Sequence, residues 1–323
     1  MKKIPITLIT GFLGAGKSTL INRIISEHKG MKFGLIVNEF GDVKLESQII
    51  KTSGEDIVEL SNGCMCCVVR SDLVNAVDSL IKASPDIDYI IVEASGLSDP
   101  APIAQTFMMQ DLEKRIRLDS ILCVIDSLNF EKNSENYNIT ASQIKFSDIM
   151  ILSKVDLVPK EKVEAIEALI KQLVPESTIL KDARAVDLDL IIDTSKYDHD
   201  NIKDIEIEEH EHEEHEEHEE HHHHAHEHVE TVFFKSDKKI DPKKFQELID
   251  NLPEGIVRAK GFINFGPGVE QPEMKYVLQF VGARKQFLLE SWTDGEEKQT
   301  ALVFIGKDFD TEKLESSLKA CEI

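Results

Sequence analysis

The sequence has no long apolar runs, and this absence limits the kind of protein that it encodes. None of its apolar segments approaches the roughly 18 residues that a membrane-spanning helix needs, so no membrane span is expected. Residues Met1–Pro5 lead directly into an apolar stretch without a small-residue cleavage site, and a secretory signal peptide is therefore not expected either. With 323 residues, the chain is long enough for two globular domains.

Basic residues are scarce relative to acidic ones. The chain carries 37 Lys and Arg against 60 Asp and Glu, which gives a net charge of −23. This charge argues against binding to the phosphate backbone of nucleic acids. The imbalance is concentrated in Asp204–Glu230, which holds thirteen acids and no Lys or Arg; without these thirteen charges the chain sums to −10.

Cysteine is also rare, with five in the chain. Three of them, Cys64, Cys66 and Cys67, lie within four residues, a spacing that suits a metal site better than disulfide bonds. This use of cysteine is typical of a reducing compartment, and we expect a cytoplasmic protein. Cys123 lies in an apolar stretch and is expected to be a core residue.

Strand-like and helix-like segments alternate through the first 195 or so residues. This alternation predicts an α/β domain with a mainly parallel sheet covered on both faces. The expected strands are Ile4–Thr10, Phe33–Asn38, Ile57–Leu60, Tyr89–Glu93, Ile121–Asp126 and Asp148–Ser153, and the expected helices are Ser18–Ser26, Asp72–Ala83 and Lys160–Leu173.

The composition changes after residue 196, which marks the end of the first domain, 1–196. Residues 197–230 lack apolar periodicity and are expected to form a disordered or weakly ordered His/Glu-rich linker. In residues 231–323, strands follow one another between two helices, which predicts a smaller α+β domain on an antiparallel sheet. Its expected helices are Pro242–Asp250 and Thr311–Ala320, its expected strands are Thr231–Lys235, Val257–Phe265, Met274–Phe280, Gln286–Trp292 and Ala301–Ile305, and its expected core includes Phe262, Phe265, Phe280, Phe287 and Trp292.

Residues 11–18 match the pattern of a phosphate-binding P-loop in full, between an expected strand and an expected helix. The glycines let backbone N–H groups curl around phosphate oxygens, and the helix N-terminus adds partial positive charge. Lys17 would contact the β- and γ-phosphates, and the Ser18 hydroxyl would join a Mg²⁺ shell. The alternative is a glycine-rich turn that matches by chance. The nucleotide-binding residues expected from this motif are Gly11, Gly14, Ala15, Gly16, Lys17, Ser18 and Thr19.

A second phosphate-sensing segment is expected at Glu93–Gly96, where another core strand ends. The Glu93 carboxylate would hold Mg²⁺ directly or through water, and Gly96 would let its backbone N–H approach the γ-phosphate. The alternative is a strand that ends in an ordinary turn.

The motif Ser153-Lys154-Val155-Asp156 follows a late strand, and we interpret it as a base reader. The Asp156 carboxylate can accept hydrogen bonds from N1–H and N2–H₂ of guanine, whereas adenine would leave this buried carboxylate unpaired. The Lys154 stem can lie along the flat base. A helix-capping Ser and Asp at a strand exit is the alternative interpretation.

The Cys64, Cys66 and Cys67 cluster precedes an expected helix. Soft thiolates at this density favour Zn²⁺ or Cu(I), and three could fill three tetrahedral positions. A redox pair or buried structural cysteines are the alternatives. A site with a free fourth position suits transient carriage, and Glu39 is a guess for the fourth ligand.

The Asp204–Glu230 tract holds ten of the twelve histidines, alternating with glutamates. Imidazole suits Zn²⁺, Ni²⁺, Cu²⁺ and Co²⁺, so we expect weak metal capture at many sites. A merely solvated acidic linker is the alternative, and it does not account for the histidines. The ligands expected here are His210, His212, His215, His218, His221, His222, His223, His224, His226 and His228.

With these motifs in their order, the chain resembles the CobW-like P-loop GTPases, relatives of the urease and hydrogenase accessory GTPases. The resemblance rests on residues 11–19, 38–41, 63–67, 93–96 and 153–156 and covers nearly the whole length. It implies a GTPase that carries or inserts a metal, Zn²⁺ in most members and Co²⁺ or others in some, and a CobW-type C-terminal domain after a His-rich linker. Ser153 departs from the Asn that most GTPases have there.

The leading hypothesis is therefore a GTP-hydrolysing metallochaperone that hands Zn²⁺, or Co²⁺ or Ni²⁺, to a client metalloprotein under nucleotide control. Lys17 and Glu93 would act in catalysis, and Glu39 or Asp42 would orient the water. A metal buffer or sensor with a structural nucleotide and a small-molecule kinase are the rival functions. A homodimer is compatible with the sequence, which does not fix the oligomeric state.

Overall fold

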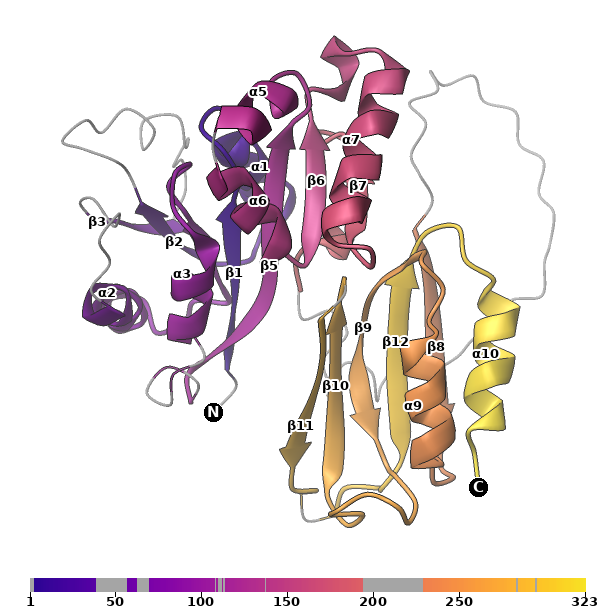
Figure 1. Cartoon of the computed structure of the whole chain (residues 1–323). Coiled ribbons are helices and arrows are strands. Elements are labelled where there is room, and N and C mark those ends of the chain that lie inside the picture. The colour runs from indigo at the N-terminus through magenta and orange to yellow at the C-terminus, as the bar shows by residue number, and fades with distance from the viewer. Residues whose placement is uncertain are drawn as a thin grey trace, which may run out of the picture. The chain divides into compact units, whose positions relative to one another are not determined.

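The computed structural model describes residues 3–38, 57–62, 70–107, 109, 112, 114–136, 138–193, 229–282, 284–293 and 295–323. The chain divides into two compact units, one of Met1–Thr194 with Val281–Ala283 and one of Ser195–Phe280 with Arg284–Ile323 (Figure 1). No helix of the described part combines the length and the hydropathy that crossing a membrane would require.

The first unit is built on a seven-stranded sheet with the order β3-β2-β4-β1-β5-β6-β7. All six neighbouring pairs are parallel, so every one of these strands ends at the same edge of the sheet. Near-continuous apolar runs in β1, β4 and β6 suit strands that are covered on both faces. The strands are β1 Ile4–Thr10, β2 Phe33–Asn38, β3 Ile57–Asn62, β4 Tyr89–Glu93, β5 Ile116–Asp126, β6 Ile149–Ser153 and β7 Thr178–Lys181.

The helices of this unit bury their apolar stripes against the sheet. Side chains of α2 and α3, such as Leu80 and Phe107, join a core cluster with β1, β4 and β5. Side chains of α5, α6 and α7, such as Phe130 and Ile166, form a second cluster with β5 and β6. The helices are α1 Lys17–Glu27, α2 Arg70–Ala83, α3 Pro100–Phe107, α5 Phe130–Asn136, α6 Asn138–Lys145 and α7 Lys160–Leu173, with short 3-10 turns at Val155–Leu157 and Leu188–Leu190.

A buried polar network ties the end of this unit to the first half of β5. The Asp119 carboxylate accepts hydrogen bonds from the Tyr89 hydroxyl at 2.6 Å and from the Asp193 backbone N–H at 3.0 Å. Arg117 forms an ion pair with Asp193, and the Ser120 hydroxyl donates to a backbone carbonyl, that of Ile191, at 3.0 Å. The described unit is therefore anchored at its last residues.

The second unit is a five-stranded sheet with the order β11-β10-β9-β12-β8, in which β12 pairs antiparallel with β8 and β9. Helices α9 and α10 pack on one face through residues such as Phe245 and Leu314 (Figure 1). Each helix begins at an aspartate, Asp241 or Asp310, whose side chain accepts backbone N–H groups of the first turn. The elements are β8 Glu230–Ser236, α9 Pro242–Asp250, β9 Ile256–Ile263, β10 Lys275–Val281, β11 Arg284–Glu290, β12 Thr300–Gly306 and α10 Thr311–Ala320.

The predicted fold class is confirmed, a parallel-sheet P-loop domain followed by a smaller α+β domain. Three helices, α3, α5 and α6, and strand β7 have no counterpart in the sequence prediction. The assignment of Phe287 to the core is wrong, because β11 is an edge strand and the Phe287 side chain is 36% exposed. Trp292 is only partly buried. Residues 197–228, most of the expected linker, lie outside the described residues.

Candidate nucleotide-binding site

The candidate site lies at the carboxyl edge of the parallel sheet. Strands β1, β4, β5 and β6 end there with Thr10, Glu93, Asp126 and Ser153. The register pairs Ile9 with Glu93 and Asp126 with Ser153, so the segments that follow these strands leave the sheet side by side. Ligands of open α/β sheets bind outside this edge.

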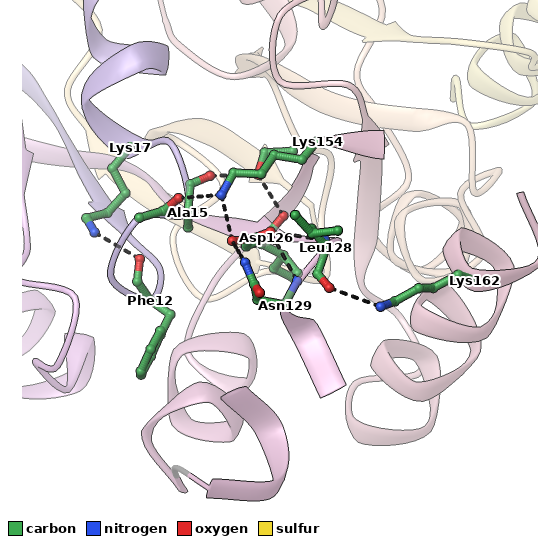
Figure 2. A network of polar contacts seen from close by, with 11 residues as sticks. Phe12, Ala15, Lys17, Asp126, Leu128, Asn129, Lys154 and Lys162 are labelled. Carbon is green, nitrogen blue, oxygen red and sulfur yellow. Dashed lines mark hydrogen bonds and ion pairs between the residues drawn. The ribbon is translucent and has the colours of Figure 1, made fainter. Parts of the chain in front are cut away.

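The P-loop follows β1 and needs its first glycine for steric reasons. Gly11 has φ of +133°, and a Cβ placed on it would lie 2.1 Å from the Val124 carbonyl oxygen of β5. The loop ends at Gly16, where α1 begins with the buried Lys17. The Lys17 ammonium donates to the Gly11 carbonyl at 3.0 Å and to the Phe12 carbonyl at 3.3 Å. Figure 2 shows the contact with Phe12. The lysine charge is thus held within the loop.

Gly96 lies directly against the phosphate loop. A Cβ added to Gly96 would sit 2.6 Å from the Leu13 backbone nitrogen. From α6, the buried Gln143 side chain donates to the carbonyls of Gly96 at 3.1 Å and Ser98 at 3.3 Å. The segment after β4 is therefore fixed against the P-loop. Nothing in the sequence around Gln143 signals this role, since its partners lie more than forty residues earlier.

Ser18 and Glu93 face one another across the site. The Ser18 hydroxyl donates to Glu93 Oε1 at 3.1 Å, and the Glu93 residue is 2% exposed. A hydroxyl and a carboxylate beside a phosphate loop are the hard oxygen donors that Mg²⁺ prefers, so these residues fit that ion. Ala15 is buried within the loop, Gly14 lies on its exposed rim, and Thr19 is exposed on α1.

The base-reading motif is joined to the P-loop by two side chains. The Ser153 hydroxyl donates to the carbonyls of Ala15 at 2.6 Å and Ile125 at 3.0 Å. The Lys154 ammonium donates to the Gly14 carbonyl at 2.8 Å and pairs with Asp126 at 2.7 Å. Figure 2 shows Lys154 lying between the P-loop and Asp126.

Asp126 is a site residue that the sequence analysis did not identify. Its side chain is buried, which raises the carboxyl pKa, but hydrogen bonds from Asn129 and Lys154 outweigh burial, so its pKa lies below the ordinary value. Its Oδ1 also accepts the backbone N–H groups of Leu128 at 3.0 Å and Asn129 at 3.2 Å. The sequence did contain one signal for this residue: an aspartate at the end of an apolar strand, with an asparagine three residues later.

Asp156 differs from expectation in its surroundings. The sequence analysis took it as a buried carboxylate, yet its side chain is 45% exposed. Its Oδ1 lies 2.9 Å from the Arg184 guanidinium, which also contacts Asp182 at 3.4 Å. These two carboxylates, Asp182 first, raise the pKa of Arg184. A base that binds Asp156 therefore meets a carboxylate already paired with an arginine.

The expected thiol and histidine ligands lie outside the described residues, as do Glu39 and Asp42. Within the described part of the chain, no group of three His, Cys, Asp or Glu is placed to hold a metal ion. Cys123 is buried in the core as predicted, and this burial raises the pKa of its thiol to about 12, which keeps the thiol protonated. The predicted site residues that lie outside the described part are Glu39, Asp42, Cys64, Cys66, Cys67, His210, His212, His215, His218, His221, His222, His223, His224, His226 and His228.

The strand ends indicate where two of these segments begin. Asn38 at the end of β2 pairs with Asn62 at the end of β3, and Val37 of β2 pairs with Glu93 of β4. The chain that carries Glu39 follows Asn38 directly, and Cys64 follows Asn62 by two residues. The Glu39 segment therefore follows the strand next to β4, and the thiol segment follows the strand one further out in the sheet.

Comparison with known proteins agrees with this architecture. A curated relative, zinc chaperone YjiA of Escherichia coli, is 28% identical over 98% of this chain and 98% of its own length. Zinc chaperone CobW of Sinorhizobium is 29% identical over 98% of this chain and 97% of its own length. The zinc-regulated GTPase metalloprotein activator 1 of Dictyostelium discoideum is 29% identical over 81% of this chain, which spans only 63% of that relative.

Two family profiles cover most of the sequence. Residues 229–322 match the cobalamin synthesis protein cobW C-terminal domain. Residues 5–181 match the CobW/HypB/UreG nucleotide-binding domain, and this match includes the P-loop, the Glu93–Gly96 segment and the base-reading motif. The chain belongs to the CobW/HypB/UreG family of nucleotide-binding proteins.

Proposed function

We propose that this protein is a GTP-hydrolysing metallochaperone, which carries Zn²⁺ on Cys64, Cys66 and Cys67 and transfers it to a client metalloprotein. The relatives named zinc chaperones and zinc-regulated GTPase metalloprotein activators support this function. We place the protein in the cytoplasm, where thiols stay reduced and metal binding competes with no disulfide. Co²⁺ and Ni²⁺ are the other metals that the ligand set would accept.

The geometry at the end of β1 supports phosphate binding. The N-terminus of α1 provides backbone N–H groups and partial positive charge for the β- and γ-phosphates of GTP. Lys17, held at 3.0 Å from the Gly11 carbonyl, supplies a full charge that compensates the transferring phosphoryl group. Glu39 and Asp42 are our candidates for the residue that orients the attacking water.

Ser18 and Glu93 would hold Mg²⁺. Mg²⁺, when bound, would supply positive charge that offsets the negative charge of the phosphates. The two side chains are hydrogen-bonded at 3.1 Å, so their oxygen atoms lie close enough together to contact one ion. Gly96, in contact with Leu13 of the P-loop, would bring its backbone N–H to the γ-phosphate. The segment after β4 would thereby respond to the presence of that phosphate.

Nucleotide control of the metal is supported by the strand order β3-β2-β4-β1, and this observation carries the proposal. The thiol segment begins after β3, the Glu39 segment after β2, and the phosphate-sensing segment after β4, at three adjacent strand ends. A change at the γ-phosphate therefore has a short route to the thiols. Any such coupling is reciprocal, so bound Zn²⁺ must change nucleotide affinity by the same factor.

Zinc titration of the nucleotide-free, GDP-bound and GTP-analogue-bound protein tests this coupling. We expect Zn²⁺ affinity to differ between the GDP and GTP-analogue states, and to fall to that of the histidine tract when Cys64, Cys66 and Cys67 are all changed to Ala. Cys321→Ala is the matched control, because it removes a buried thiol from the other unit. Equal Zn²⁺ affinity in all three states would contradict the proposal.

Deleting residues 205–228, which leaves β8 whole, separates the thiol site from the histidine tract, which we propose as a linker that captures metal weakly. The deletion should lower the number of bound metal ions and leave the tight thiol site unchanged. Loss of tight metal binding on deletion of the tract would fit the buffer alternative instead. So would a full-length chain that shows no GTP turnover with metal present.

Base selectivity is tested by Asp156→Asn, with Asp182→Asn as the control. We propose that Asp156 reads N1–H and N2–H₂ of guanine, so its amide variant should lose about a hundredfold in GTP affinity and gain affinity for xanthosine triphosphate. Asp182 shares Arg184 but is assigned no base contact, and its variant should keep the GTP preference. Equal competition by ATP and GTP in the wild type would favour the kinase alternative.

A further inference from the structure

We infer that Asp126 is a positioning residue for the nucleotide: through Lys154 it holds the base-reading motif and the phosphate loop in one fixed arrangement. This inference rests on the proposed function, because it concerns how the same nucleotide site binds a purine base. Asp126 is the last residue of β5, and its register partner Ser153 is the last residue of β6. The position of Lys154, one residue further, is thereby set by the sheet.

The Asp126 carboxylate is surrounded by donors. Oδ1 accepts the backbone N–H groups of Leu128 and Asn129, and Oδ2 accepts the Asn129 side-chain amide at 2.8 Å and the Lys154 ammonium at 2.7 Å. Figure 2 shows these contacts converging on one side chain. A carboxylate with this many donors cannot turn without losing several hydrogen bonds, so it fixes the ammonium that it contacts.

Lys154 itself adopts an uncommon backbone conformation, with φ of 56° and ψ of 30°. This left-handed region is unfavourable for a side chain with a Cβ and persists where the surroundings compensate. The contacts to Asp126 and to the Gly14 carbonyl supply that compensation. Lys154 is 32% exposed along its side chain, so without Asp126 its ammonium would have free access to water, and the stem would leave the place where it faces a base.

The arrangement also orients the P-loop. Peptide groups are planar, so a side chain that holds a carbonyl also fixes the direction of the N–H on the next residue. Lys154 holds the Gly14 carbonyl, and Ala15 N–H in the same peptide group donates to Phe12 at 3.1 Å. Ser153 holds the Ala15 carbonyl and thereby sets the Gly16 N–H. Base and phosphate recognition therefore share one rigid frame that depends on Asp126.

A double-mutant cycle on the full chain tests this role, with GDP affinity as the measurement. We expect Asp126→Asn and Lys154→Ala each to lower GDP affinity about tenfold, the range for a hydrogen bond to a charged group. Because Asp126 acts through Lys154, the double variant should bind within about twofold of Lys154→Ala. A double variant weakened about a hundredfold, the product of the two single effects, would overturn the inference.

Two further variants separate positioning from folding. Asp119→Asn is the matched control, because Asp119 is 3% exposed against 4% for Asp126 and lies in the first half of the same strand. It should lower the unfolding temperature and leave GDP affinity unchanged. Asn129 is exposed, and Asn129→Ala removes the side-chain amide that donates to Asp126. This change should lower GDP affinity about threefold in the wild-type background and should have no effect in the Lys154→Ala background. An equal effect in both backgrounds would overturn the inference.

The outcomes also distinguish this inference from the proposed function. A wild-type chain that binds no guanine nucleotide would overturn both. A wild type that binds GDP, together with an Asp126→Asn variant of unchanged affinity, would overturn the positioning role alone and leave the GTPase proposal intact.

Discussion

Replacing Gly96 with alanine should uncouple the phosphate loop from the segment after β4. The new Cβ would lie 2.6 Å from the Leu13 nitrogen, 2.7 Å from Leu13 Cδ2 and 2.8 Å from Leu13 Cα. Two of these three atoms are backbone, so no side-chain rotation can relieve the clash. Ordinary contact begins at 3.4 Å, and the loop or the Gly96 segment must therefore move by about 0.8 Å.

A displacement of this size is large for a catalytic site. A misplacement of about 1 Å can lower the rate of a positioned reaction by about a hundredfold, and we expect kcat/KM for GTP to fall by about that factor. Steady-state release of inorganic phosphate measures the effect, and thermal unfolding shows whether the variant remains folded.

Gly34→Ala is the control for crowding without a change at the site. Its Cβ would lie 2.4 Å from Leu80 Cδ2, a side-chain atom in the core between β2 and α2. Overpacking of this kind costs about 1–3 kcal/mol of stability, and kcat/KM should be kept. A folded Gly96→Ala variant with kcat/KM within threefold of the wild type would refute the reasoning.

Three other perturbations have defined outcomes. Ser18→Ala removes the hydroxyl that donates to Glu93 at 3.1 Å. In a Mg²⁺ titration, the concentration for half-maximal GTP hydrolysis should rise about tenfold. An unchanged Mg²⁺ requirement would show that Ser18 does not hold the ion. Tyr89→Phe leaves the buried Asp119 carboxylate with one donor fewer and should cost about 1–3 kcal/mol in urea unfolding, with unchanged GDP affinity. Hydrogen bonds from Lys32 and then Ser84 lower the pKa of Asp86 to about 2. The stability that this carboxylate contributes is therefore present above pH 3.8 and is lost as the pH falls toward 2. NMR titration should show the pKa of Asp86 return toward 3.8 in Lys32→Met relative to the wild type.

The parts of the site that depend on backbone geometry were predictable from sequence. The P-loop requires glycines where backbone must approach backbone, as Gly11 does at Val124, and such requirements leave a fixed spacing of residues. Asp126 left no comparable signal, because its role depends on Lys154, 28 residues later, and on a register set by the sheet. The pairing of Asp156 with Arg184 was invisible for the same reason.

The start of β5 was missed because its pattern is polar. Ile116–Ser120 contains Arg117 and Asp119, which read as surface residues, yet the Asp119 residue is only 3% exposed. Their burial is balanced by contacts with Tyr89 and with Asp193, partners 30 and more residues away in the sequence. The prediction for Phe287 was wrong in the opposite direction, since an apolar residue was expected to be buried and is exposed. A strand pattern gives no indication that the strand lies at the edge of the sheet.

The anchoring of Asp193 has an evolutionary consequence. Asp193 is the last described residue ahead of the acidic and histidine-rich tract, and it is clamped to the beginning of β5, whereas the phosphate loop contacts the other end of that strand. Changes in the number of histidines in the tract are therefore expected to leave the nucleotide-binding edge of the sheet unaltered. Under the proposed function, selection would thereby tune the capacity for metal capture through tract length, while the hydrolytic machinery stays constant.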